Sequence, residues 1–476
     1  ACPMTDTPPA RRLLLPLVIL LSALPLSADD NWPQFRGRQA TGIGSGQPPI
    51  VWNVETGENI LWRTPIAGLA HSSPIVWGDR VYVTTAVSAE SADPSLGTGW
   101  LGGTGKSATD GGAWSWQLHA YDLASGQLAW KQEVTTGQPL RRRHLKATHA
   151  NCTPATNGEY IVAFFGAEGL YCYDASGQLV WKTGFGSLHS GPYGFTDYEW
   201  GFASSPIIHD QYVVVQCDCL NTSFAAVLRL EDGTEVRRIA RSDVPTWSTP
   251  LVIQAGDQTQ LVCNGYREMA GYDFDTGERL WFLYGGGDIP VPTPLFAHGL
   301  VVLTNGHGRS PVYAIAPAAR GDITPDGDAR LEDEAEAETG AEEPEAYAGA
   351  AGQLPDGLVW HQPRNGSYIP TPIVVGDLLY TCNDNGRLTV TDVRDGSLVY
   401  QERVGGGATY SASAVGTDTH LYFADEAGSV HVVKTGREFA IAAENAMQET
   451  VMATPAIAGR RLLVRTVKQL VCIGQP

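Results

Sequence analysis

Histidine, arginine, aspartate, asparagine and aromatic side chains recur at two kinds of position in this chain. One set stands just before copies of a repeated small-small-Pro phrase, and the other stands at the tips of predicted hairpins. Such side chains exchange hydrogen bonds with a ligand and stack on its rings, so their convergence would form a small-ligand pocket. The candidate binding residues are His71, His149, Asn151, Trp247, Arg267, His307, Tyr368, Asp384 and Tyr410.

Signatures of known catalytic sites do not accompany these residues. The sequence contains no G-x-S-x-G nucleophile elbow, no H-E-x-x-H metal motif and no P-loop. A single Gly97-x-Gly99-x-x-Gly102 occurs, but it lacks the preceding strand and following helix of a dinucleotide site. We therefore assign no catalytic residue.

Asp322, Asp326 and Asp328 are the candidate metal ligands, in a D-x-T-x-D-G-D pattern that is similar to the start of a calcium loop. The twelfth position, where such loops carry a bidentate glutamate, is Asp333 here. A plain acidic loop is the competing interpretation, because residues 322–345 contain eleven acids and one base.

The elements that must position these residues come from an internal repeat. Each copy has two small residues, or one, before a proline, then an apolar strand, a turn and a second strand; one degenerate copy has Ala414 in place of the proline. The spacing of the last copies, 42 and 41 residues, matches a four-stranded propeller blade. Two longer spacings imply insertions at about residues 88–115 and 321–353. The repeat positions are Pro74, Pro154, Pro206, Pro250, Pro294, Pro372, Ala414 and Pro455.

A second phrase alternates with the first. Its clearest copy is Ala120-Tyr-Asp-x-x-Ser-Gly-x-x-x-Trp130. Aspartate and serine can bond the turn backbone, and glycine accepts positive φ in a tight hairpin. The tryptophan would then lie flat between neighbouring sheets and bury a large aromatic surface.

Counting both phrases predicts an all-β protein, a single eight-bladed β-propeller of four-stranded antiparallel blades. Only 21 residues follow Pro455, too few for a blade, but residues 50–73 carry a turn phrase without a small-Pro strand. The N- and C-terminal segments would therefore share one blade and close the ring, which removes its open edges. We expect an N-terminal arm at 29–49 and the propeller at 50–476.

These phrases resemble the PQQ-like propeller family, which includes the quinoprotein alcohol dehydrogenases and BamB. The opening Asn31-Trp-Pro-Gln-Phe-Arg-Gly37 is also similar to the start of secreted bacterial members of that family. For the dehydrogenases, the resemblance implies PQQ with Ca²⁺ as cofactor and a vicinal disulfide between adjacent cysteines. Here the nearest pair, Cys217 and Cys219, is separated by Asp218, and none of that family's Ca²⁺ ligands can be assigned. Buried strand thiols are the favoured interpretation of this pair.

Composition narrows the class of protein further. The chain has 54 glycines and 13 tryptophans among 476 residues, and only 17% of its residues are charged, which disfavours a helical bundle. A formal net charge of −19 leaves no basic face for nucleic acid.

Residues 1–28 have the three-part pattern of a secretory signal peptide. Arg11 and Arg12 precede an apolar run at 13–26, and cleavage is expected after Ala28. A membrane anchor is the alternative, but 14 residues with two prolines are short for a spanning helix. We therefore expect a periplasmic or secreted protein.

The favoured function is that of an extracytoplasmic binding or scaffolding module for a protein, a small molecule or a glycan at the channel mouth. A PQQ-dependent dehydrogenase with a diverged site is the alternative, and a hydrolase or lyase acting on polysaccharide is a third hypothesis. We expect a monomer that neither binds nucleic acid nor spans a membrane after signal cleavage.

Overall fold

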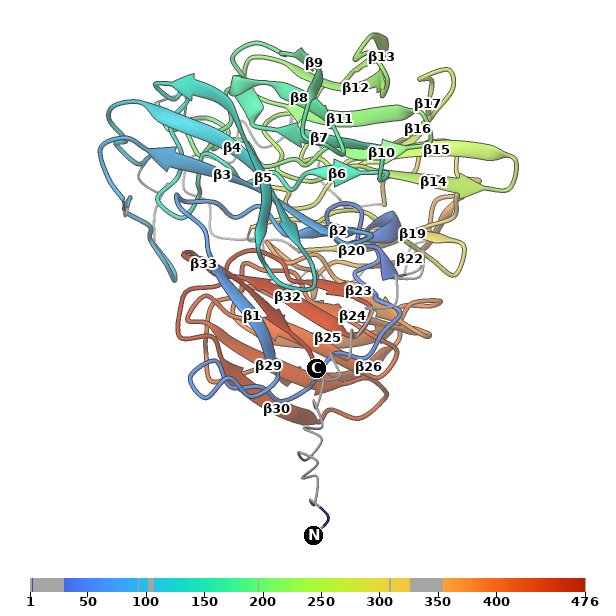
Figure 1. Ribbon diagram of the computed structural model, residues 1–476. Coiled ribbons are helices and arrows are strands. Elements are labelled where there is room, and N and C mark those ends of the chain that lie inside the picture. The colour runs from blue at the N-terminus through green and yellow to red at the C-terminus, as the bar shows by residue number, and fades with distance from the viewer. Residues whose placement is uncertain are drawn as a thin grey trace.

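The computed structural model describes residues 2, 30–92, 94–101, 107–195, 197–307, 310–325 and 354–475. The predicted signal peptide, apart from Cys2, lies outside these residues, as do Asp326, Asp328, Gly102 and most of the second insertion. The described residues form eight β-sheets arranged as the blades of a propeller (Figure 1). The predicted all-β, eight-bladed architecture is confirmed. Within the described part, no helix has the length and apolar character of a membrane span.

Each of the first four blades has four antiparallel strands in sequence order. Blade 1 contains β2 (Ile75–Trp77), β3 (Arg80–Ser88), β4 (Trp114–Asp122) and β5 (Leu128–Gly137). Blade 2 contains β6 (Ala155–Thr156), β7 (Tyr160–Phe164), β8 (Leu170–Asp174) and β9 (Leu179–Thr183). Blade 3 contains β10 (Ile207–His209), β11 (Tyr212–Asp218), β12 (Ser223–Arg229) and β13 (Glu235–Ala240). Blade 4 contains β14 (Leu251–Ala255), β15 (Gln258–Cys263), β16 (Met269–Asp273) and β17 (Arg279–Leu283).

The other four blades repeat the pattern. Blade 5 contains β18 (Leu295–Ala297), β19 (Leu300–Thr304), β20 (Val312–Ile315) and β22 (Leu358–Gln362). Blade 6 contains β23 (Ile373–Val375), β24 (Leu378–Cys382), β25 (Arg387–Asp392) and β26 (Leu398–Arg403). Blade 7 contains β27 (Val415–Gly416), β28 (His420–Ala424), β29 (Ser429–Lys434) and β30 (Ile441–Ala446). Blade 8 contains β31 (Ala456–Ala458), β32 (Arg461–Arg465), β33 (Gln469–Ile473) and β1 (Ile60–Pro65).

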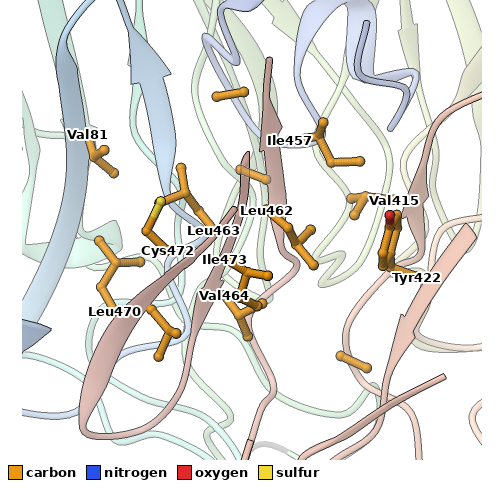
Figure 2. Packing of buried hydrophobic residues seen from close by; sticks show 14 of the residues in the cluster. Val81, Val415, Tyr422, Ile457, Leu462, Leu463, Val464, Leu470, Cys472 and Ile473 are labelled. Carbon is orange, nitrogen blue, oxygen red and sulfur yellow. The ribbon is translucent and has the colours of Figure 1, made fainter. Parts of the chain in front are cut away.

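Blade 8 closes the ring with both ends of the propeller, as the sequence predicts. Strand β1 pairs antiparallel with β33, with Trp62 opposite Cys472, and Figure 1 shows the blue strand beside the red ones. The same blade packs on both neighbours through a continuous apolar cluster that includes Val81, Leu463 and Val415 (Figure 2). Burial on both sides explains why the three central residues of β32, Leu462, Leu463 and Val464, are all apolar and do not alternate with polar ones.

The small-Pro phrase joins each blade to the next around the channel. The residue before the proline donates its backbone N–H to the hydroxyl oxygen of its counterpart in the following blade, for example Ser73 N to Thr153 Oγ1 at 3.0 Å. Six such bonds are present among the described residues, and their acceptors are Thr153, Ser205, Thr249, Thr371, Ser413 and Thr454. The repeat requires serine or threonine here because alanine would leave a buried N–H without an acceptor.

The turn phrase holds the outer parts of neighbouring blades together. The indole of Trp181 in blade 2 donates to the carbonyl of Leu230 in blade 3 at 2.7 Å. Gly233 of that turn has φ +72°, and a Cβ there would stand 2.6 Å from the indole ring. Glycine is therefore required both for the backbone and for the tryptophan above it. Trp62, Trp130 and Trp360 make the equivalent bonds to Leu123, Ala175 and Val393.

Blades 3, 4, 6 and 7 depart from this pattern, and the outer strands of blades 6 and 7, β26 and β30, contain no tryptophan. Strand β13 of blade 3 has no tryptophan, and Arg237 donates instead to the carbonyls of Phe274 and Asp275 in the blade 4 turn. Trp281 of blade 4 is fully buried and donates to Gln260 of its own blade at 3.3 Å. The edge of this blade is covered by β21 (Gly321–Asp322), a fifth strand that pairs parallel with β17. The second insertion thus begins against the preceding blade.

The N-terminal arm crosses one end of the channel and touches the inner strands of several blades. Trp32 pairs with Val76 of blade 1, and Pro33 accepts a bond from Thr156 of blade 2. A short 3₁₀ turn, η2 (Arg38–Ala40), follows. Arg36 is fully buried, and its guanidinium donates to carbonyls of the arm and of blades 6 and 7. The arm therefore closes this end of the ring.

All eight cysteines are free thiols, and seven of them are buried. Cys217 and Cys219 lie on β11 and in the loop that follows it, and they pack in the core between blades 2 and 3. Burial raises the pKa of both thiols, so they remain protonated at neutral pH. The predicted burial is confirmed for both thiols, but Cys219 lies just beyond the end of the strand.

Candidate ligand cavity at the channel mouth

A cavity of about 340 Å³ occupies the channel opposite the arm. Its wall is built from the loops that enter the inner strands and from hairpin tips of blades 5 and 6. The small residues of the small-Pro phrase line its deeper part, together with Phe35 from the arm. The cavity is therefore framed by seven repeats of one sequence phrase: Ser73, Thr153, Ser205, Thr249, Thr371, Ser413 and Thr454.

The structure brings six of the nine predicted binding residues to this wall. They come from loops before blades 1, 2, 4 and 6 and from the hairpins β19–β20 and β24–β25. These loops converge because every blade directs the same two connections toward the same end of the ring. The six residues are His71, Asn151, Trp247, His307, Tyr368 and Asp384.

His149 points away from the cavity. Its Nε2 lies 2.9 Å from Asp110 Oδ2, and its ring packs edge-on against Trp114 at 4.7 Å between centroids. Arg143, fully buried, also bonds Asp110, at 2.7 Å. Burial opposes ionisation of Asp110, but the bonds from His149 and Arg143 prevail and lower its pKa to about 2. His149 thus belongs to a buried ion-pair cluster.

Tyr410 and Arg267 also lie outside the wall. Tyr410 is buried, and its hydroxyl donates to the carbonyl of Val404 at 3.0 Å. Arg267 lies at the tip of the β15–β16 hairpin and donates to the hydroxyl of Tyr193 at 2.7 Å. It is at the rim, outside the residues that enclose the cavity.

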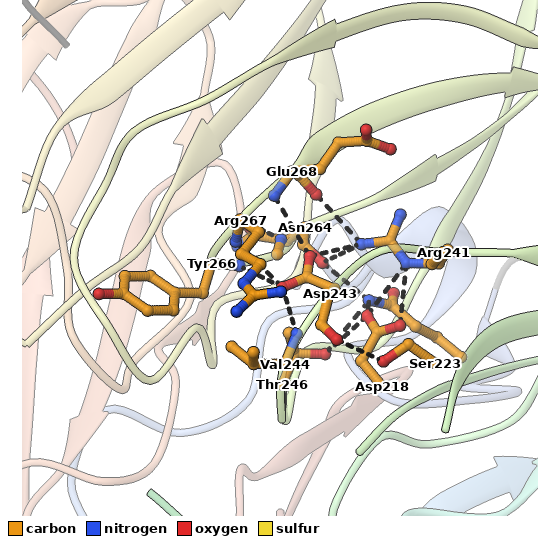
Figure 3. Close-up of polar contacts among 12 residues, drawn as sticks. Asp218, Ser223, Arg241, Asp243, Val244, Thr246, Asn264, Tyr266, Arg267 and Glu268 are labelled. Atoms are coloured by element: carbon orange, nitrogen blue, oxygen red, sulfur yellow. Dashed lines mark hydrogen bonds and ion pairs between the residues drawn. The ribbon is translucent and has the colours of Figure 1, made fainter. Parts of the chain in front are cut away.

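A buried polar network fixes the hairpin that carries Arg267 (Figure 3). Asp243 accepts backbone N–H bonds from Val244, Tyr266 and Arg267. Arg241 bonds Asp243 at 3.0 Å and Asp218 at 3.0 and 3.1 Å. Asp218, which separates the two cysteines in the sequence, therefore serves this network between blades 3 and 4.

The first insertion roofs the mouth, and the sequence did not predict this role. Gly97 N donates to Leu145 O at 2.8 Å, and Gly99 has φ +73°, so the first two of the three glycines in the isolated motif shape a covering loop. Trp100, the next residue, lines the cavity although it is 69% exposed. Its ring stacks on His307 with 5.7 Å between centroids and an interplanar angle of 14°.

Glu426 holds this roof to the far side of the ring. Its carboxylate accepts from Gly99 N at 2.6 Å, from Lys146 Nζ at 2.6 Å and from Ser411 Oγ at 2.5 Å. Lys146 also donates to Gly99 O at 3.0 Å. Glu426 lies at the tip of the β28–β29 hairpin of blade 7. The corresponding hairpin tips of blades 5 and 6 supplied predicted site residues, so the same position in blade 7 could have identified Glu426 from the sequence.

Aromatic side chains form two parts of the wall. On one part, Trp100 stacks on His307, and His307 meets Tyr368 edge-on at 5.2 Å. On the other, Trp247 packs against Trp200 at 5.7 Å, and its indole donates to Gly201 O at 2.7 Å. Two tryptophan-containing surfaces therefore bound one concave space, which suits a ligand with a flat face.

The protein environment shifts the pKa values of the titratable groups of the wall in different directions. Burial lowers the pKa of His71 and of His144 to about 4, so both rings are neutral at pH 7. Burial raises the pKa of Asp384. The bond to Asp288 raises the pKa of His307.

The wall lacks the donor set that PQQ with Ca²⁺ would need. Among the described residues, no group of three histidine, cysteine or acidic side chains is placed to hold a metal ion. Asp384 is an acidic residue of the wall, whereas the Glu426 carboxylate is taken up by three donors. Asp322 accepts bonds from Thr324 N and Oγ1 on the edge of blade 4; its predicted co-ligands lie outside the described residues.

A closed ring of eight blades, joined by small-Pro and tryptophan phrases, defines a PQQ-like β-propeller. The family model for outer membrane protein assembly factor BamB matches residues 35–183, 116–326 and 225–414, and the chain belongs to this family. No curated protein sequence matches the chain.

Two solved structures show the same fold. BamB from Moraxella catarrhalis is 12% identical with a TM-score of 0.50, over 82% of this chain and 98% of that one. A europium-containing methanol dehydrogenase is 10% identical with a TM-score of 0.58, over 92% of this chain and 90% of that one. At these identities the likeness concerns the fold alone.

Proposed function

We propose that this chain is an extracytoplasmic binding module that holds a small ligand in the cavity at the channel mouth. The observation that carries the proposal is the 340 Å³ cavity itself, with aromatic surfaces, a few polar groups and a roof from the first insertion. Small-molecule sites are concave, largely apolar and about 300–1,000 Å³ in volume. The arm at the opposite end makes the channel a recess and not a passage.

Location outside the cytoplasm is supported by two independent observations. The pattern of residues 1–28 is that of a secretory signal peptide. The family description names an outer membrane assembly factor, which acts in that compartment. A binding role also agrees with the assembly function in that description.

The alternative, a PQQ-dependent dehydrogenase, has the support of the fold shared with the methanol dehydrogenase. The wall residues do not fit that cofactor. PQQ carries three carboxylates, whereas the lysine of the wall is paired with Glu426 and two wall histidines are neutral. An anionic ligand would also meet Asp384. We therefore propose no redox step.

The test is a ligand-observed saturation-transfer screen of small ring compounds that are neutral, cationic or anionic, with PQQ and CaCl₂ included. We expect neutral or cationic rings to bind and PQQ not to bind. Trp100→Ala should remove the signal, because this indole forms part of the wall and is too exposed to matter for folding. Leu398→Ala is the matched control, since Leu398 is a similarly exposed apolar residue on β26 outside the wall.

Three outcomes would overturn the proposal. One is that no compound in the screen binds the wild-type protein. Another is that the compounds that bind do so equally well to Trp100→Ala, which would place the site elsewhere. The third is saturable binding of PQQ alone that depends on Trp100, which would favour the dehydrogenase hypothesis instead.

A further inference from the structure

A ring of serine and threonine residues whose hydroxyl groups have unused donors lines the deeper part of the cavity. A serine or threonine hydroxyl has one O–H donor and two acceptor lone pairs. In six of the seven small-Pro residues of the wall, the oxygen accepts a backbone N–H from the preceding blade. Among the described residues, none of these six hydroxyls donates to a protein acceptor. The protons are therefore left for whatever occupies the channel.

Two neutral histidines add one acceptor and one donor. His71 Nε2 lies 2.8 Å from the carbonyl of Lys146, which can only accept, so Nε2 carries the proton and Nδ1 is a free acceptor. His144 Nδ1 accepts from Lys146 N at 3.1 Å, so its Nε2 carries the proton. The two rings thus offer complementary hydrogen-bonding atoms without adding charge to the wall.

In the described chain, Asp384 is the wall carboxylate that no close cation neutralises. Lys146 and Glu426 form a close pair at 2.6 Å. Asp384 makes no ion pair among the described residues, and burial raises its pKa although the charges of Lys146 and His307 act in the opposite direction. A ligand with carboxylate or phosphate groups would be repelled, whereas a ligand with hydroxyl groups can donate to Asp384.

The aromatic surfaces complete the pattern. A pyranose ring has a face of C–H groups that packs on the electron-rich face of tryptophan, and its edge carries hydroxyl groups that both donate and accept. Trp100 and Trp247 offer such surfaces in the same cavity as the hydroxyl ring.

We infer that the ligand is an uncharged sugar, bound with its C–H face on the tryptophan surfaces and its hydroxyl groups on Asp384, the two histidines and the ring of serines and threonines. This inference rests on the proposed function. An organic cation would also suit the aromatic surfaces and Asp384, but it has no use for a ring of hydroxyl donors. The many mixed donors and acceptors therefore favour a polyol.

The experiment is a calorimetric titration series on the full mature chain. The neutral probes are the methyl glycosides of glucose, galactose and mannose, with N-acetylglucosamine. The charged probes are glucuronate, galacturonate and tetramethylammonium. We expect at least one neutral sugar to bind saturably and its uronate to bind at least about tenfold more weakly, which corresponds to about 1.4 kcal/mol.

Asp384→Asn separates charge from shape. It removes the negative charge and keeps an acceptor, so we expect the uronate-to-sugar affinity ratio to rise about tenfold or more. Asp395→Asn is the matched control, because Asp395 is an exposed acid in the outer turn of the same blade; it should leave the ratio unchanged. Thermal midpoints of both variants establish that they are folded.

The outcomes distinguish failure of the sugar inference from failure of the proposed function. Binding of tetramethylammonium alone, lost in Trp100→Ala, would overturn the sugar inference and leave the cavity as a binding site. The same holds if ring compounds bind in the cavity but no neutral sugar does. A sugar whose binding is unaffected by both Trp100→Ala and Asp384→Asn would overturn the inference and the proposed site together.

Discussion

Individual side chains around the channel show how burial sets their chemistry. His71, His119 and His144 form no ion pair with an acid in the described chain, and burial lowers the pKa of each to about 4. An exposed histidine has a pKa near 6.5. The folded protein therefore binds fewer protons than the unfolded chain between these two values.

This difference predicts a pH dependence of stability. As pH falls from about 6.5 to 4, the unfolded chain binds protons at these histidines and the folded protein does not. The free energy of unfolding should therefore fall by ~1–3 kcal/mol for each buried histidine. His119, which bonds Tyr121 and Gln117, is the best probe because it lies outside the cavity wall. His119→Gln should therefore flatten the pH dependence.

Denaturant unfolding of wild-type protein and His119→Gln at pH 7.5, 5.5 and 4.5 checks this prediction. The free energy of unfolding of the variant should be lower than that of wild type at pH 7.5 and should approach the wild-type value at pH 4.5. Parallel curves would show that His119 takes up its proton in the folded state, contrary to the lowered pKa.

Positions in the site could be predicted from the sequence better than orientations. The period identifies which residues stand before a blade or at a hairpin tip, and Trp247 and Asp384 reach the cavity in this way. His149 lies in the same kind of loop, but its ring bonds Asp110 of the first insertion and therefore points away from the cavity. A repeat pattern cannot predict a hydrogen-bond partner that comes from an inserted segment. The bond from Gly99 N to the Glu426 carboxylate, across 327 residues of sequence, could not be predicted for the same reason.

The strands and turns show which residues of the repeat are kept from blade to blade and which are replaced. Where the turn phrase has its tryptophan, the indole packs between two blades and donates to a turn carbonyl, as Trp181 does. Blade 3 meets the same need with Arg237, which bonds two carbonyls of the next turn. The sequence could not predict this substitution, because arginine on an outer strand usually points to solvent.

The two roles of tryptophan can be separated by a pair of substitutions. Trp181→Ala should destabilise the protein by about 3–5 kcal/mol, since this indole is 8% exposed and joins blades 2 and 3. Trp100→Ala should change stability by at most about 0.5 kcal/mol, because its ring is 69% exposed. Thermal and denaturant unfolding measure both effects, and equal losses in the two variants would contradict the distinction.

At the scale of the whole molecule, one contact closes the ring of blades and two others cover the ends of its channel. Blade 8 joins the chain ends, the arm closes one end of the channel around Arg36, and the first insertion covers the other through Glu426. The repeat and its closure could be predicted from the sequence because both are periodic. The sequence also predicts an arm at 29–49, but not that the arm and the roof close the two ends of the channel, since each is held by contacts between segments hundreds of residues apart.

If this closed ring holds a neutral sugar at its mouth, the bound sugar should be visible there. The decisive measurement is a crystal structure of the protein with the neutral sugar that binds best in the titration series. We expect electron density for the sugar within the wall that contains Trp100, Trp247 and Asp384. Density at a blade edge or on the arm, with the mouth cavity holding only water, would refute a sugar site at the mouth.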